Sequence, residues 1–195
     1  MYPPEHFMQK NTEQLHALIN NFPLATIFMP CSNSQLNNIC HVPMLFNSLE
    51  NMFIAHVAKH NPLSKLDNKQ VNLLFNSDNC YLSPSYADNQ TLPSWLYASV
   101  LVTAKVHIIK DELKKDLVMR TLTSHFEKTF EPKWKIDEVP EQHRNTMYQH
   151  LSFIELTPIH WQGNFKLSQN KSAAIRGKIK QSLVDANKHS IAALF

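Results

Sequence analysis

The chain has 195 residues, of which 43% are hydrophobic and 18% are charged, and its formal net charge at pH 7 is +3. This composition is that of an ordinary globular chain, so we expect one domain over residues 1–195. Gly163 and Gly177 are its only glycines, which excludes the GxGxxG, GxxxxGK and GxSxG motifs and the dinucleotide, P-loop and hydrolase sites that depend on them.

Neither export nor membrane insertion is expected. The first residues have prolines where a signal peptide needs an apolar run, and no stretch of about eighteen apolar residues occurs. Three cysteines, Cys31, Cys40 and Cys80, show no CxxC spacing and indicate reduced thiols in a cytoplasm. A metal is not expected either, because Cys40 and His41 have no second ligand pair at metal spacing.

The first half of the chain predicts one helix followed by short strands. Thr12 is expected to cap an amphipathic helix that buries Leu15 and Leu18 and ends at Pro23. Strands are predicted at residues 24–29, 39–46, 52–58 and 71–76, with the polar turn 30–38 making the first two a hairpin.

The second half alternates between strand and helix. Residues 95–109 form the longest β-like stretch, rich in Val and Ile, and should be a central barrel strand. A helical insertion is predicted at about residues 111–150, and residues 152–161 return to a strand. The insertion should pack on the core through one apolar stripe, formed by Leu113, Leu117, Leu122, Phe126 and Phe130.

The C-terminal segment is basic. Ser172 is expected to cap a helix over about residues 172–188, with Lys166, Ser168 and Gln169 in the turn before its N-terminus. Free backbone N–H groups and the helix dipole favour an anion there, although an ordinary capped turn with solvated lysines gives the same pattern. Residues 160–195 carry a net charge of +5, so a nucleic-acid footprint, a phosphate site and a solvated helix face all remain open.

Eight residues of this segment, 165–172 (FKLSQNKS), resemble the C-terminal signature of the PaiB-type FMN-binding negative transcriptional regulators. Six further blocks resemble that family and occur in its order: residues 1–7 (MYPPEHF), 22–26 (FPLAT), 41–43 (HVP), 56–62 (HVAKHNP), 81–86 (YLSPSY) and 92–97 (LPSWLY). The resemblance covers nearly the whole chain. It implies an α+β fold of mostly β structure, an FMN-binding split β-barrel similar to pyridoxamine-phosphate oxidases, which forms a homodimer with FMN held between the subunits.

The same resemblance implies which residues contact FMN. His56, Lys59 and Asn61 follow a strand, where related oxidases place basic groups on the FMN phosphate, and Lys166 is expected to contact the phosphate as well. The alternative for His56 is a loop histidine bonded to backbone. The other implied FMN contacts are hydroxyl, aromatic and amide groups, namely Tyr81, Ser83, Ser85, Trp95, Tyr97, Ser168 and Gln169. Ser83 and Ser85 could equally form a turn, and Trp95 and Tyr97 could be ordinary cross-strand packing.

Several positions depart from the family pattern. Leu96 stands where the family usually has Asn, Ala55 replaces a glycine, Ser77-Asp78 replaces Gly-Pro, and Ala87 replaces an aromatic residue. Each change removes a polar contact or a close backbone approach, so we expect weakened FMN binding with the fold retained.

Three functions are consistent with the sequence. The first is an FMN-binding negative transcriptional regulator, which would contact DNA through the basic C-terminal helix if it contacts DNA at all. The second is a flavin-dependent oxidoreductase, and the third is a degenerate barrel that has lost FMN and acts as an interaction module. No Cys–His or Ser–His–Asp arrangement supports covalent catalysis, and no catalytic residue is assigned.

Overall fold

The computed structural model describes residues 3–30 and 38–195. Its strands are β1 (Met8–Gln9), β2 (Leu24–Phe28), β3 (Ile39–Pro43), β4 (Leu45–Asn47), β5 (Met52–Ala58), β6 (Gln70–Asn76), β7 (Cys80–Leu82), β8 (Ser94–Ile109) and β9 (Leu151–Lys166). Its α-helices are α1 (Thr12–Asn21), α2 (Glu112–Phe126), α3 (Glu141–Tyr148), α4 (Ala173–Asp185) and α5 (His189–Ala192). Short 3₁₀ turns are η1 (Glu5–Phe7), η2 (Pro62–Lys65), η3 (Pro84–Tyr86), η4 (Glu127–Thr129) and η5 (Ile136–Glu138).

The strands follow the order β3-β2-β6-β8-β9-β5-β4, with β1 added to β9 and β7 added to β8. The predicted hairpin is present, since β2 pairs antiparallel with β3 and places Leu24 opposite Pro43. β5 pairs antiparallel with β9, placing Ala58 opposite Leu151. This register is important for the site, because it brings the residues that follow β5 next to those that precede β9.

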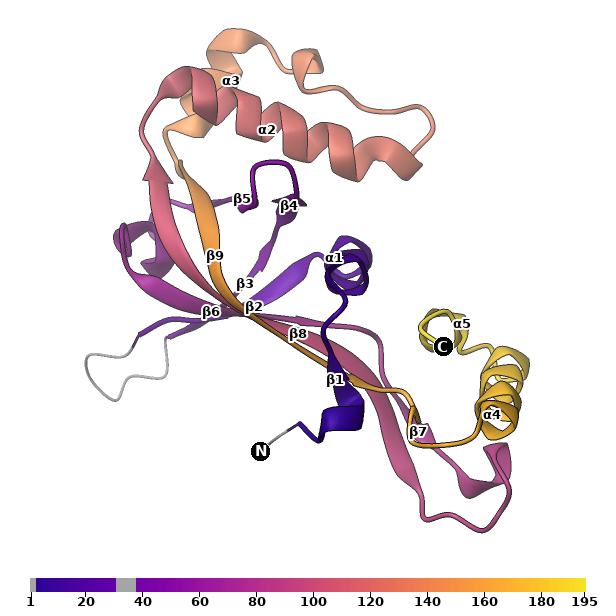
Figure 1. Cartoon of the computed structure of the whole chain (residues 1–195). Helices are drawn as coiled ribbons and strands as arrows, with labels where there is room; N and C mark the ends of the chain where they lie inside the picture. Colours follow the sequence, from indigo (N-terminus) through magenta and orange to yellow (C-terminus); the bar gives the residue numbers. More distant parts are fainter. Residues whose placement is uncertain (1–2, 31–37) are drawn as a thin grey trace. The chain divides into compact units, whose positions relative to one another are not determined.

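Two compact units can be distinguished, and β8 and β9 each contribute residues to both. Unit 1 comprises Met1–Phe22, Phe75–Leu101 and Gln162–Phe195, and unit 2 comprises Pro23–Leu74 and Val102–Trp161. Figure 1 shows α2 and α3 as neighbours within unit 2, and α4 and α5 as neighbours within unit 1.

Each unit contains a hydrophobic cluster that fixes its helices. In unit 2, Ile54 and Phe153 of the paired strands β5 and β9 pack with Val118 and Leu122 of α2 and with Tyr148 of α3. In unit 1 the cluster joins β7 and the start of β8 to the two C-terminal helices, through Cys80, Leu82, Leu96, Ile179, Leu183, Ile191 and Ala192. The helices are thus held by buried apolar faces, which supply most helix stability in proteins.

The predicted core stripe of the helical insertion was confirmed at Leu122 and Phe126 and wrong at its other three residues. Leu113 and Leu117 are 83% and 62% exposed, and Phe130 is also exposed, whereas Val118 and Leu122 are buried. The inward face of α2 carries Val118 and Leu122, which pack in the unit 2 cluster. The same orientation places Lys114 toward β9, with its Nζ 2.7 Å from Glu155 Oε1.

Other boundaries also differ from prediction. Asn11, rather than Thr12, caps α1 by accepting a hydrogen bond from Gln14 N. The second hairpin strand is interrupted at Met44, which gives β3 and β4, and β9 continues five residues past the predicted end at Trp161. The C-terminal helix begins as predicted, with Ser172 accepting from Ile175 N, but ends at Asp185. Most of the predicted turn 30–38, including Cys31, lies outside the described residues.

In the described part of the chain, no helix combines the length and the apolar character that crossing a membrane would require.

Candidate functional site

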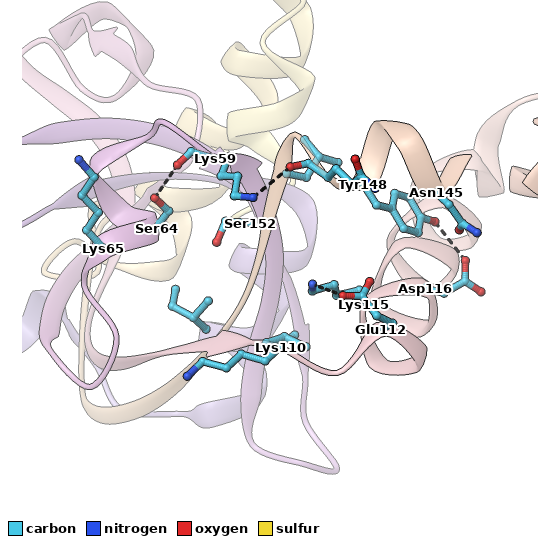
Figure 2. Close-up of a pocket in the computed structure, with 14 residues that line it drawn as sticks. Lys59, Ser64, Lys65, Lys110, Glu112, Lys115, Asp116, Asn145, Tyr148 and Ser152 are labelled. Carbon is cyan, nitrogen blue, oxygen red and sulfur yellow. Dashed lines mark hydrogen bonds and ion pairs between the residues drawn. The ribbon is translucent and has the colours of Figure 1, made fainter. Parts of the chain in front are cut away.

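Four lysines line a cavity of about 750 Å³ in unit 2. It is lined by Lys59, Ser64, Lys65, Ile108, Ile109, Lys110, Glu112, Lys115, Asp116, Asn145, Tyr148, Gln149, Leu151 and Ser152. Four cations face two carboxylates, and its volume falls in the range of about 300–1,000 Å³ typical of ligand sites. We call this cavity the lysine pocket (Figure 2).

The segment after β5 forms one wall of the lysine pocket because its own polar groups fold it into a tight turn. Asn61 caps η2 by accepting from Leu63 N at 2.9 Å. The Ser64 hydroxyl donates to the carbonyl oxygens of Lys59 (2.8 Å) and Asn61 (2.7 Å). This turn holds Lys59 and Lys65 at the pocket, as Figure 2 shows. Asn61, predicted to contact FMN, shapes this turn, and its contact with FMN stays a prediction.

The four lysines differ in how far they are already neutralised. Lys115 is paired with Glu112 at 2.7 Å, and Lys59 Nζ donates to the carbonyl oxygen of Gln149 at 3.4 Å. Lys110 lies close enough to Asp67 to lower the pKa of that carboxyl, although hydrogen bonding by Ile108 N is the larger cause. Among the described residues Lys65 has no ion-pair partner. Within the described ranges neither Lys59 nor Lys65 is ion-paired, so these two lysines on the β5 side can contact an anion.

The opposite wall is fixed by a hydrogen bond between two helices. Tyr148 of α3 donates to Asp116 Oδ1 of α2 at 3.2 Å. Burial and the negative charge of Asp116 raise the pKa of Tyr148 to about 12. Burial would raise the pKa of Asp116, but hydrogen bonds from Arg120 and Tyr148 and the charges of Arg120 and Arg144 lower it overall. The pair therefore remains a phenol and a carboxylate at neutral pH.

His56 lies within β5, three residues before Lys59, and is half-buried. Its ring stands 5.9 Å from that of Phe153, and its buried Nδ1 has no hydrogen-bond partner among the described residues. Burial lowers the pKa of His56, so the imidazole is neutral at neutral pH. A buried nitrogen without a partner costs free energy and is common where a ligand completes the site.

The predicted residues of β7 and β8 lie in unit 1. Tyr81 and Trp95 are opposite each other in the β7–β8 pair, with ring centroids 6.2 Å apart, and both are about half exposed. Trp95 Nε1 donates to Asn79 Oδ1 at 2.9 Å, which fixes the indole plane. The structure thus brings these two aromatic side chains together on an accessible surface, where they could contact a flat ring.

Their neighbours have roles within unit 1. Ser83 caps η3 by accepting from Ser85 N, and the two serine hydroxyls are 2.8 Å apart, so the turn that the sequence allowed is present. The Tyr97 hydroxyl accepts a hydrogen bond from Asn164 Nδ2 at 3.1 Å. Tyr97 therefore ties β8 to β9.

The C-terminal signature is folded by its own glutamine. The Gln169 amide donates to the carbonyl oxygen of Phe165 and accepts from Leu167 N, and Ser168 is buried with a φ of 60°. Lys166 was expected in a turn, but it is the last residue of β9. Gln169 and Ser168 thus maintain the loop, and Lys166 at the end of β9 is half-buried.

The residues that depart from the family pattern pack in the core or hydrogen-bond to the backbone. Leu96 is 1% exposed in the unit 1 cluster, and Ala55 is fully buried in β5. The Ser77 hydroxyl accepts from Ala98 N at 2.9 Å and donates to the carbonyl oxygen of Asp78. Ala87 packs against the unit 1 cluster. None of these four positions lines the lysine pocket.

Sequence reasoning missed most of the lysine pocket. Ser64 and Lys65 follow the predicted motif 56–62 by two and three residues, so their position was a usable signal. Lys110, Lys115 and Ser152 reach the pocket through strand pairing and helix placement, which leave no local pattern. His56, Lys59 and Asn61 belong to unit 2, and the other eight predicted residues belong to unit 1. The described residues contain no group of three or more His, Cys, Asp or Glu side chains that could hold a metal ion.

Residues 1–158 match the family model described as "Putative FMN-binding domain". The chain belongs to this family of FMN-binding domains, and FMN is its cofactor. The chain is also similar to the Bacillus subtilis (strain 168) "Protease synthase and sporulation protein PAI 2", at 22% identity over 88% of this chain and 84% of that protein.

Two solved structures share the fold. The flavocytochrome Anf3 from Azotobacter vinelandii has a TM-score of 0.64 at 13% identity, covering 82% of this chain and 69% of its own. The FAD and heme binding protein from Mycobacterium smegmatis has a TM-score of 0.62 at 14% identity, covering 87% and 78%. The predicted α+β split-barrel fold with mostly β structure is confirmed.

The residues present fit FMN. The lysine pocket offers ammonium and hydroxyl donors suited to a phosphate dianion, and the unpartnered His56 Nδ1 lies in the strand that leads to it. Tyr81 and Trp95 offer aromatic faces suited to an isoalloxazine ring. When bound, FMN supplies one- and two-electron redox chemistry.

Proposed function

We propose that this protein is an FMN-binding negative transcriptional regulator of the PaiB type. The observation that carries the FMN part is the lysine pocket, because Lys59 of the family-like motif meets three further lysines there. The regulator part is supported by the similarity to PAI 2, which extends over most of both chains.

We assign the FMN phosphate to the β5 side of the lysine pocket. Lys59 and Lys65 provide the charge, and Ser64 holds the turn that carries them. The phosphate of FMN is a dianion near neutral pH, and charge-assisted hydrogen bonds from ammonium groups are its usual protein contacts. For unit 1, taken by itself, the family resemblance supports a contact of Tyr81 and Trp95 with the isoalloxazine ring and of Lys166 with a phosphate.

We propose a cytoplasmic homodimer in which a second copy of the chain completes the FMN site. Two features support it. Tyr81 and Trp95 are half-exposed aromatics that a partner subunit would cover. Cys40 and Cys80 are free thiols, as expected in a reducing compartment.

DNA contact, if direct, is assigned to α4. Lys178 and Lys180 are exposed on this helix, and Lys188 is exposed just after it. Arg176 is excluded from that set because its guanidinium packs over Phe195. Phosphate contacts by a few lysines give binding that weakens steeply with salt.

Purification with and without added FMN tests the cofactor first. The protein should show flavin absorbance, and Lys166→Ala should weaken FMN about tenfold to a hundredfold, the effect expected for one charge-assisted contact. Lys178→Ala, which removes an equal charge from α4, should leave FMN affinity unchanged. A colourless protein that binds no added FMN would instead indicate a barrel that has lost its flavin.

A mobility shift with DNA from the protein's own promoter tests the regulator part. Binding should fall with salt and should be weakened by Lys178→Ala and Lys180→Ala together. Absence of binding at low salt would reject direct DNA contact. Steady turnover of a nicotinamide cofactor by the FMN-loaded protein would assign it to the flavin-dependent oxidoreductases instead.

A further inference from the structure

Unit 1 contains a second cavity, of about 540 Å³, whose lining differs from that of the lysine pocket. Its walls come from β1, α1, the end of β9, α4 and the C-terminal residues. Arg176 is the only charged side chain among the residues that line it. The other lining groups are amides or apolar side chains, including Gln9, Gln14, Leu18, Phe165 and Phe195. We call this the arginine cavity.

Arg176 is held in place by an aromatic ring. Its guanidinium carbon lies 5.6 Å from the centroid of the Phe195 ring, a distance at which cation and ring attract each other. Its Nε is buried and has no hydrogen-bond partner among residues 3–30 and 38–195, and no ion pair to Arg176 occurs in the same residues. An unpaired, partly desolvated cation costs free energy, and an anionic ligand would remove that cost.

Several amide groups around Arg176 already have hydrogen-bond partners within the protein. Gln9 Nε2 donates to Gln14 Oε1, and Gln9 Oε1 accepts from Asn11 N at 2.8 Å. Both polar atoms of the Gln169 amide are bonded to the backbone. The cavity therefore presents one strong anion donor and several fixed dipoles, so it is suited to a single negative charge.

The remaining wall is apolar. Leu18, Phe165 and Leu167 are buried side chains that border the cavity, and Phe195 lies beneath the guanidinium. A ligand that fills about 540 Å³ beside these groups would bury hydrocarbon as well as bind Arg176. A phosphate dianion finds several cations in the lysine pocket, whereas only one is available here.

We propose that the arginine cavity binds a small organic monocarboxylate with an apolar body, its carboxylate on the Arg176 guanidinium. The site uses residues of unit 1 and does not depend on the FMN or regulator assignments. Planar carboxylate and guanidinium groups match in bidentate geometry, which distinguishes Arg from Lys at such sites.

Isothermal titration calorimetry on the full chain, saturated with FMN, tests this assignment with defined probes. Phenylacetate and hexanoate should bind with one-to-one stoichiometry. Phenylacetamide, which keeps the apolar body without the charge, and inorganic phosphate should bind at least about tenfold more weakly. No detectable binding of either carboxylate up to about 10 mM would overturn the proposal.

Two variants locate the binding. Arg176→Gln should weaken phenylacetate at least about tenfold, while Lys178→Gln, an equal charge change on the same helix, should have no effect. Gln14→Glu keeps the acceptor for Gln9 Nε2, adds a negative charge to the lining, and should also weaken binding, so the test survives if Arg176→Gln unfolds. Unchanged binding in Arg176→Gln and Gln14→Glu, equal loss in Lys178→Gln, or competition between phenylacetate and FMN would each overturn the proposal.

Discussion

Glu155 on β9 is a buried carboxylate, and Lys114 of α2 lies 2.7 Å from it. The lysine side chain is 46% exposed, so the pair is partly solvated. The pair links α2 to β9, and α2 also carries Lys115 and Asp116 of the lysine pocket. We expect the pair to help the apolar cluster orient α2 and this wall of the pocket.

Glu155→Gln should therefore destabilise the protein by about 1–3 kcal/mol, between the values of exposed and buried ion pairs. The matched control is Glu112→Gln, which removes an exposed carboxylate paired with Lys115 and should cost less than about 1 kcal/mol. Chemical denaturation monitored by circular dichroism measures both. Equal effects of the two substitutions would show that the buried pair does not orient α2.

Ionisation of Asp116 should make the stability of the folded protein depend on pH. The folded-state pKa of Asp116 is below its ordinary value of 3.8, so its contribution is complete above about pH 4 and is lost as pH falls through the folded pKa. Asp116→Asn should lower the melting temperature at pH 7, and the gap to the wild type should close below pH 4. A gap that stays constant down to pH 2 would mean that the carboxylate is not preferentially stabilised in the folded state.

The two glycines should respond in opposite directions to alanine. A Cβ at Gly163 would lie 2.5 Å from Leu15 Cδ2 and 2.6 Å from Gln9 O, whereas a Cβ at Gly177 meets nothing within 4 Å. Gly163→Ala should destabilise by about 1–3 kcal/mol through overpacking, and Gly177→Ala should stabilise α4 by about 0.5–1 kcal/mol. Thermal unfolding of both variants checks the prediction, and a neutral Gly163→Ala would contradict the close approach of β1 to β9.

Trp95 should report FMN binding by fluorescence. If its indole borders the isoalloxazine, FMN will quench tryptophan emission, and Trp95→Phe will remove most of the quenching. Trp134→Phe, which changes a tryptophan of unit 2 outside the lysine pocket, should leave the quenching intact. The assignment of the ring to Tyr81 and Trp95 fails if Trp95→Phe retains full quenching.

The strands were the most predictable part of the fold. β5 occupies the predicted range and β8 begins one residue early, because alternating β-branched residues form a strong local signal. The face of α2 could not be predicted, since Leu113 and Leu117 have suitable helical spacing yet point to solvent. Lys114 of the same helix pairs with Glu155, 41 positions away, and such a distant contact is not visible in a local pattern.

In the candidate site, too, local motifs could be predicted and long-range contacts could not. A motif of adjacent residues identified Lys59, but its pocket is completed through the pairing of β5 with β9 and the packing of α2 and α3. Gln169 and Asn61 were predicted as ligand contacts because they are polar and lie in matched motifs. In the structure they hold turns, a role that residue type alone does not separate from ligand contact.

Comparison of FMN with riboflavin tests the central claim most directly, because the two flavins differ only in the phosphate assigned to the lysine pocket. The wild type should bind FMN at least about a hundredfold more tightly than riboflavin, and Lys59→Ala with Lys65→Ala should reduce that ratio about tenfold or more with riboflavin affinity unchanged. Lys69→Ala, an exposed lysine outside the pocket, should keep the wild-type ratio. Equal affinities for the two flavins, or a ratio that survives the loss of Lys59 and Lys65, would contradict the assignment.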